Sequence, residues 1–143
     1  MRLSDINKTK GVIFTHLDPE TQHLYHIYVT GILTDPDYLA LEVGYIPVDR
    51  SIAELLIHER GIEKHRLTRL MHRKIKEPLT LCIWDDGSHL IVDGNHRFVA
   101  ATLSNRKHVP VRMVPGSIWK KYIVRDLLDV QKTNLPTKFS GIL

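Results

Sequence analysis

Leu90-Ile91-Val92-Asp93-Gly94-Asn95-His96-Arg97-Phe98-Val99-Ala100-Ala101 is the stretch of sequence that decides the expected fold. Its first three residues form an apolar run typical of a strand, and a glycine turn follows. From Asn95 onward the residues show the apolar pattern of a short helix. A second run of strand type begins at Val109. This order predicts a strand, a tight turn and a helix whose first turn lies at the end of the strand.

The turn carries one carboxylate, one imidazole and one guanidinium, from Asp93, His96 and Arg97. The first N–H groups of a helix have no partner within the helix and lie at the positive end of its dipole, so they favour an anion. Gly94 allows close approach to the backbone, and a guanidinium has a planar fork that suits phosphate. The residues therefore indicate a phosphate site at Gly94, Asn95, His96 and Arg97. A second interpretation stays open, in which Asp93 only caps the helix and Arg97 is solvated.

Composition indicates an ordinary globular domain. The 143 residues are 43% hydrophobic and 25% charged, and no apolar run approaches the roughly 20 residues that span a bilayer. The N-terminus does not resemble a signal peptide, and the single cysteine, Cys82, cannot form an internal disulfide. We therefore expect a cytoplasmic protein with no membrane partner. The net charge of +4 suits a phosphorylated ligand or nucleic acid.

Sequence patterns upstream of the motif predict a hairpin, a strand and two helices. The hairpin joins runs at 11–17 and 23–33 through the turn residues Asp18-Pro19-Glu20-Thr21, and a strand is expected at 43–48. Ser51-x-x-Glu54 is typical of a capping box that opens a helix, and Gly61 is expected to end it. Helical spacing predicts a second helix over 62–76, stopped by Pro78.

The C-terminal half predicts strands at 79–84 and 89–92, joined by the hairpin turn Asp85-Asp86-Gly87-Ser88. The motif helix and the strand from Val109 follow, then a helix over 118–130 capped by Ser117, and a tail. This order fits an α+β, or mixed α/β, domain. We expect one domain over 1–143. Its core would span about 43–115, with the N-terminal hairpin at 11–33 and the C-terminal helix and tail at 117–143.

Asp93-Gly94-Asn95-His96-Arg97, followed by Ala100-Ala101 and Val109-Pro110-Val111, resembles the signature of the ParB/sulfiredoxin superfamily. The resemblance runs from about Tyr45 to Pro115, roughly half of the chain. It is closest to the free serine kinase branch, whose motif reads Asp-Gly-His-His-Arg. That branch also has an upstream His-Glu pair, to which His58-Glu59 is similar.

Two departures separate the chain from other branches of the superfamily. Sulfiredoxin needs a cysteine where Asn95 stands, so its redox chemistry is not expected. The partition protein ParB typically has an arginine where His96 stands, and a helix-turn-helix module follows its nucleotide domain. Only 28 residues follow Pro115, too few for that module.

The resemblance implies a ParB/sulfiredoxin-like fold and a phosphotransferase that moves phosphate from a nucleotide to an alcohol acceptor. It implies Glu59 as general base and Asp93 and His96 as further catalytic residues. Gly94, Asn95, His96 and Arg97 would bind the phosphate, and Asp93 would hold Mg²⁺. The implied cofactors are ATP or ADP, or else CTP, with Mg²⁺, and the implied partner is a small hydroxyl substrate.

An alternative of a different class is a ParB-like module that binds nucleotide or DNA without turnover, or a ParB-like nuclease. Arg66, Arg69, Arg73 and Lys76 are spaced to form one cationic stripe on the predicted basic helix 62–76. Such a stripe is more often a solvated helix face, but it could contact the phosphates of a nucleic acid.

Overall fold

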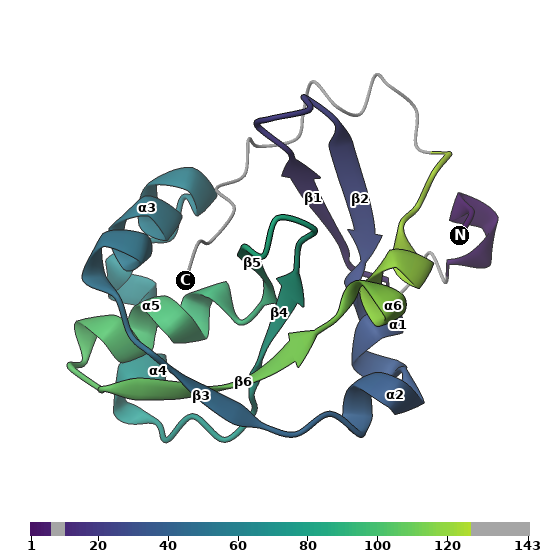
Figure 1. The fold of residues 1–143 in the computed structure, drawn as a ribbon. Helices are drawn as coiled ribbons and strands as arrows, with labels where there is room; N and C mark the ends of the chain where they lie inside the picture. Colours follow the sequence, from purple (N-terminus) through teal and green to yellow (C-terminus); the bar gives the residue numbers. More distant parts are fainter. Residues whose placement is uncertain (7–10, 127–143) are drawn as a thin grey trace.

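The computed structural model describes residues 1–6 and 11–126, and its centre is a four-stranded sheet (Figure 1). In sheet order, the strands are β3 (Gly44–Pro47), β6 (His108–Val114), β4 (Leu79–Ile83) and β5 (His89–Asp93). β4 and β6 run parallel, whereas the β3–β6 and β4–β5 pairs are antiparallel. This mixed sheet and the helices around it make the fold α+β, as predicted.

Alternate residues of the central strands point to opposite faces of the sheet, and each face has its own apolar core. Leu81 and Ile91 belong to the first core, whereas Cys82 and Leu90 belong to the second. Both faces of β4 are therefore covered, which explains why that strand is an unbroken apolar run apart from Thr80.

The two cores are covered by different helices, which Figure 1 shows on opposite sides of the sheet. The first core is covered by α3 (Arg50–Arg60), α4 (Thr68–His72) and α5 (Asn95–Leu103). The second is covered by α1 (Val29–Thr34), α2 (Pro36–Leu39) and α6 (Gly116–Trp119). Within residues 1–6 and 11–126, no helix is long and apolar enough to cross a membrane.

The predicted N-terminal hairpin is confirmed, but it is shorter than expected. β1 (Ile13–Leu17) pairs antiparallel with β2 (Leu24–Tyr28) in a separate two-stranded sheet. The second run of the hairpin was predicted to continue to residue 33, which is wrong, since α1 begins at Val29. Val29 and Ile32 are buried in the second core, so packing prevails over the β propensity of this segment.

α3 ends at Gly61 as predicted, with that residue in the left-handed conformation at φ +61°. Its N-terminus differs from the prediction. Asp49 caps the helix by accepting a hydrogen bond from the N–H of Ile52, at 3.1 Å. Ser51 lies inside the helix, and its hydroxyl donates to Asp49. The predicted capping box is therefore wrong, because a stronger cap stands two residues earlier.

The predicted helix over 62–76 is also wrong. The segment contains only the 3-10 helix η2 (Lys64–Leu67) and the short α4, and Arg73 is extended. The guanidinium of Arg106 donates to the carbonyl oxygens of Arg73 and Met71, so these carbonyls have a partner outside the helix. Because the helix stops, the predicted basic stripe over Arg66, Arg69, Arg73 and Lys76 is not one helix face.

The C-terminal helix predicted over 118–130 is wrong over the described residues. α6 ends at Trp119, and the 3-10 helix η3 (Lys120–Tyr122) follows. Ile123 then forms a bridge with Ile27, and the N–H of Val124 donates to the carbonyl of His26 at 2.8 Å. Pairing with the edge of β2 replaces the helix. The rest of the predicted helix and tail, 127–143, lies outside the described residues.

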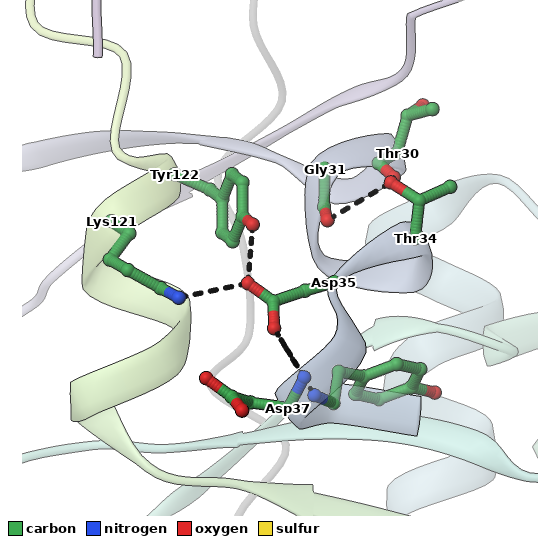
Figure 2. Close-up of polar contacts among 8 residues, drawn as sticks. Thr30, Gly31, Thr34, Asp35, Asp37, Lys121 and Tyr122 are labelled. Atoms are coloured by element: carbon green, nitrogen blue, oxygen red, sulfur yellow. Dashed lines mark hydrogen bonds and ion pairs between the residues drawn. The ribbon is translucent and has the colours of Figure 1, made fainter. Parts of the chain in front are cut away.

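A buried carboxylate ties this C-terminal segment to the helices α1 and α2 (Figure 2). Asp35, only 4% exposed, accepts hydrogen bonds from the hydroxyl of Tyr122 and the ammonium of Lys121, and it also caps α2. These donors hold the pKa of Asp35 well below its usual value, the Tyr122 hydroxyl contributing most. Burial, with the Asp35 bond, raises the pKa of Tyr122 to about 12.

The Asp35 network predicts a specific loss of stability in acid. Because the pKa of Asp35 is depressed in the folded protein, its contribution is complete above the usual carboxyl pKa of about 4 and is lost as the pH falls below that value. We expect the melting temperature of the wild type to fall more steeply between about pH 6 and pH 3 than that of Asp35→Asn. The lower limit, pH 3, is about one unit below the usual carboxyl pKa. Parallel acid dependences in the two proteins would contradict this account.

Candidate anion-binding site

A cavity of about 410 Å³ lies where the N-terminal hairpin, the end of α3 and the turn between β5 and α5 meet. It is lined by Val12, Ile13, Phe14, Thr15, Arg60, Val92, Asp93, Gly94, Asn95 and His96. The structure thus brings four of the five residues of the predicted motif to one opening. The hairpin, which the sequence analysis treated as an addition to the core, forms the opposite wall.

The first turn of α5 opens into this cavity without a side-chain cap. Gly94 occupies the N-cap position at φ +100°, and no side chain among residues 1–6 and 11–126 accepts from the N–H groups of the first turn. The interpretation of Asp93 as a helix cap is therefore wrong. The side-chain amide of Asn95 donates to the carbonyl of Ile91, and its Oδ1 is buried with no hydrogen-bond partner in the described part of the chain. Uncapped N–H groups at a helix start favour an anion.

Gly94 is required by both its conformation and its surroundings. A Cβ at this position would lie 2.7 Å from Cγ of Leu79 and 3.1 Å from a terminal nitrogen of Arg97. The backbone of the turn therefore lies directly against the start of β4. This close packing fixes the direction in which α5 leaves the sheet.

We expect Gly94→Ala to lower the free energy of unfolding by about 2–5 kcal/mol, through left-handed strain and a steric clash. Gly87→Ala is the matched control, because Gly87 is also left-handed, at φ +86°, but has open space around it. It should cost only about 1–2 kcal/mol for the strain alone. Chemical denaturation measures both. Equal losses would show that the contact with Leu79 adds nothing.

Arg97 does not line this cavity; its guanidinium instead fastens the turn to the start of β4. One terminal nitrogen pairs with the Oδ2 of Asp93 at 2.9 Å. The other donates to the carbonyl of Glu77 at 2.7 Å and to that of Pro78 at 3.3 Å. Its side chain is 20% exposed. The Arg97 guanidinium, which was expected to bind phosphate, thus forms its hydrogen bonds with Asp93 and with backbone carbonyls.

Arg97→Lys tests this fastening role. An ammonium cannot span Asp93 and the carbonyl of Glu77 as the planar fork does. We expect the free energy of unfolding to fall by about 1–2 kcal/mol. This is the contribution of a charged hydrogen bond, reduced because solvent screens the partly exposed Asp93. Arg66→Lys, whose arginine pairs with Glu63 on the surface, should stay within about 0.5 kcal/mol of wild type. A loss no larger than that of the control would refute the fastening role.

Arg60 is the cation that the cavity does contain, and the sequence analysis missed it. Its guanidinium lies over the ring of Phe14, 4.1 Å from the centroid. Burial lowers its pKa to about 10, so it is charged at neutral pH. Within the described chain no hydrogen-bond acceptor or acidic side chain pairs with it. A half-buried charge without a counterion is costly, which an anionic ligand would relieve.

A sequence signal for Arg60 exists, although it is weak. The residue follows His58-Glu59 directly and precedes the helix-ending Gly61. A cation at the last turn of a helix usually satisfies the helix dipole. Only the hairpin, through Phe14, shows that this one turns toward the motif.

The other predicted catalytic residues lie at different places. His96 lines the cavity and is exposed at its rim. Glu59 and His58 are in the last turn of α3, and neither lines the cavity. On β1, burial lowers the pKa of His16, the charge of Asp18 opposes this shift, and the charge of Arg60 lowers the pKa further.

The described side chains of the cavity offer one carboxylate, that of Asp93, for the expected Mg²⁺. No group of three or more His, Cys, Asp or Glu side chains in the described part of the chain could hold a metal. Asp93 lines the cavity, however, and only its Oδ2 is used in the pair with Arg97. One carboxylate fits a Mg²⁺ that arrives with a nucleotide, since this ion is often held by one or two carboxylates and the substrate phosphates.

Comparison of the chain with models of known protein families gave no match, and comparison with curated proteins gave none either. The ParB/sulfiredoxin resemblance therefore stays a prediction.

Proposed function

We propose that the protein binds a nucleotide through its phosphates in the cavity between β1, α3 and α5, and transfers a phosphoryl group to an alcohol. One observation carries this proposal: the backbone N–H groups at the start of α5 and the guanidinium of Arg60, neither of which has an acidic partner among the described residues, converge on one cavity. Backbone N–H groups and a guanidinium are complementary in charge and geometry to phosphate oxygens.

Phosphoryl transfer depends mostly on positioning and on neutralising charge, and these parts supply both. The N–H groups of the first turn and Arg60 would hold the phosphates, while Phe14 keeps the guanidinium in place. Mg²⁺, held by Asp93 and the phosphates, would neutralise further charge. The alcohol oxygen forms a bond to the terminal phosphorus, and the bond to the bridging oxygen breaks.

His96 is the group that we propose accepts the hydroxyl proton of the acceptor. A general base has to come within hydrogen-bond reach of that hydroxyl. His96 lines the cavity, whereas Glu59 does not, so the implied role of Glu59 has less geometric support than that of His96. The alcohol would approach from the exposed rim on which His96 lies.

Nucleotide binding is tested by thermal shift and calorimetry with ATP, ADP, CTP and GTP, with and without Mg²⁺. A ligand of the native state raises the melting temperature by mass action. Arg60→Gln should weaken binding by about 10- to 100-fold, the equivalent of a charged hydrogen bond of about 1.5–3 kcal/mol. Arg66→Gln is the control and should bind as the wild type does. No shift with any nucleotide, or equal binding by both variants, would remove the proposal.

Turnover is tested separately, by mass spectrometry of small alcohols incubated with the bound nucleotide and Mg²⁺. We expect a mass gain of one phosphoryl group, and a rate at least about 100-fold lower in His96→Ala, since general bases contribute about 10²–10⁴-fold. Glu59→Gln should keep most of the activity. Loss of activity in Glu59→Gln but not in His96→Ala would assign the role of general base to Glu59. Nucleotide binding without any phosphoryl transfer would leave only the binding function.

A further inference from the structure

A second and larger cleft, of about 670 Å³, lies on another part of the surface. It is formed by the β3 edge of the sheet, β6 and the segment after α4, and it is lined by Val43, Tyr45, Lys74, Ile75, Lys76, Pro78, Arg106, His108 and Pro110. It shares no lining residue with the cavity at α5. Its ligand can therefore be considered independently of the proposed function.

The register of β3 and β6 explains why an aromatic ring is exposed here. Tyr45 is opposite Pro110, and the next pair, Ile46 and Val109, faces the first core. Tyr45 and Pro110 consequently lie on the other face of the sheet, at an edge that no described helix covers. Tyr45 is 71% exposed, the highest value among the exposed large hydrophobic residues of the described chain.

The cleft is cationic. Two lysines and an arginine line it, Lys74, Lys76 and Arg106, and the imidazole of His108 lines it too. Arg106 is held in place by the carbonyls of Met71 and Arg73, whereas neither lysine has an acidic partner among the described residues. No carboxylate lines the cleft in the part of the chain that the structure describes. A surface of this kind repels a second copy of itself and favours a polyanion.

We propose that this cleft binds single-stranded nucleic acid, with a base stacked on Tyr45 and the adjoining phosphates near Lys74 and Lys76. An exposed ring beside unpaired cations is the combination that proteins use to hold single strands without reading their sequence. A duplex keeps its bases stacked internally, so it would leave Tyr45 unused. An acidic peptide would use the charges but would gain little from the ring.

Fluorescence anisotropy with labelled oligo(dT) and oligo(U), and with a DNA duplex of equal length, tests the proposal. We expect single strands to bind more tightly than the duplex, with an affinity that falls steeply from about 50 mM to 200 mM salt. Tyr45→Ala should weaken single-strand binding at least about fivefold, the lower end of what a base–aromatic stack contributes, and Tyr45→Phe should restore it. The double variant Lys74→Gln/Lys76→Gln should reduce the salt slope by about 1.4, since each phosphate contact accounts for about 0.7.

Arg50→Gln/Lys64→Gln removes the same charge from exposed residues outside the cleft and is the matched control. It should leave binding close to that of the wild type. The proposal is overturned by failure to bind single strands at about 50 mM salt. It is also overturned by equal losses in the two double variants, by indifference to Tyr45→Ala, or by poly-glutamate competing as well as the oligonucleotides do.

Discussion

The packing of the Gly94 turn against the start of β4 is the constraint on which the rest of the site depends. The turn can lie there because Gly94 has no side chain to collide with Leu79. Arg97 then fastens the turn by joining Asp93 to the backbone at Glu77 and Pro78. With its first turn placed in this way, α5 presents uncapped N–H groups to a cavity. The arginine of the motif serves the fold, and the guanidinium that lines the cavity comes from another residue.

That residue is Arg60, and it reaches the motif because of the N-terminal hairpin. β1 supplies Phe14 as a platform for the guanidinium and closes the cavity on the side opposite α5. The Asp35 network holds Tyr122 and Lys121 against the start of α2, which keeps the chain after β6 near α1 and the end of β2. The hairpin therefore completes the cavity. The Asp35 network acts elsewhere and secures the chain after β6.

Local patterns predicted the elements whose cause is local. The strand–turn–helix around Gly94, the β4–β5 hairpin and the end of α3 at Gly61 follow from apolar runs and glycine turns, and the structure has them. The predictions over 62–76 and 118–130 failed because partners far away in sequence decide those segments. Arg106 takes the carbonyls at the end of α4, and β2 takes Ile123 as a partner. Arg60 escaped detection for the same reason, since only the tertiary contact with Phe14 distinguishes it from an ordinary helix-end cation.

The central claim is that the first turn of α5 is the place where an anionic ligand binds. Titration of the isotope-labelled protein with ADP and with inorganic phosphate, followed by backbone amide chemical shifts, tests it most directly. The account predicts that the amides of Gly94, Asn95 and His96 shift first and furthest, together with the side-chain N–H of Arg60. Shifts that cluster around Tyr45 and Lys74, with none at residues 94–96, would contradict it.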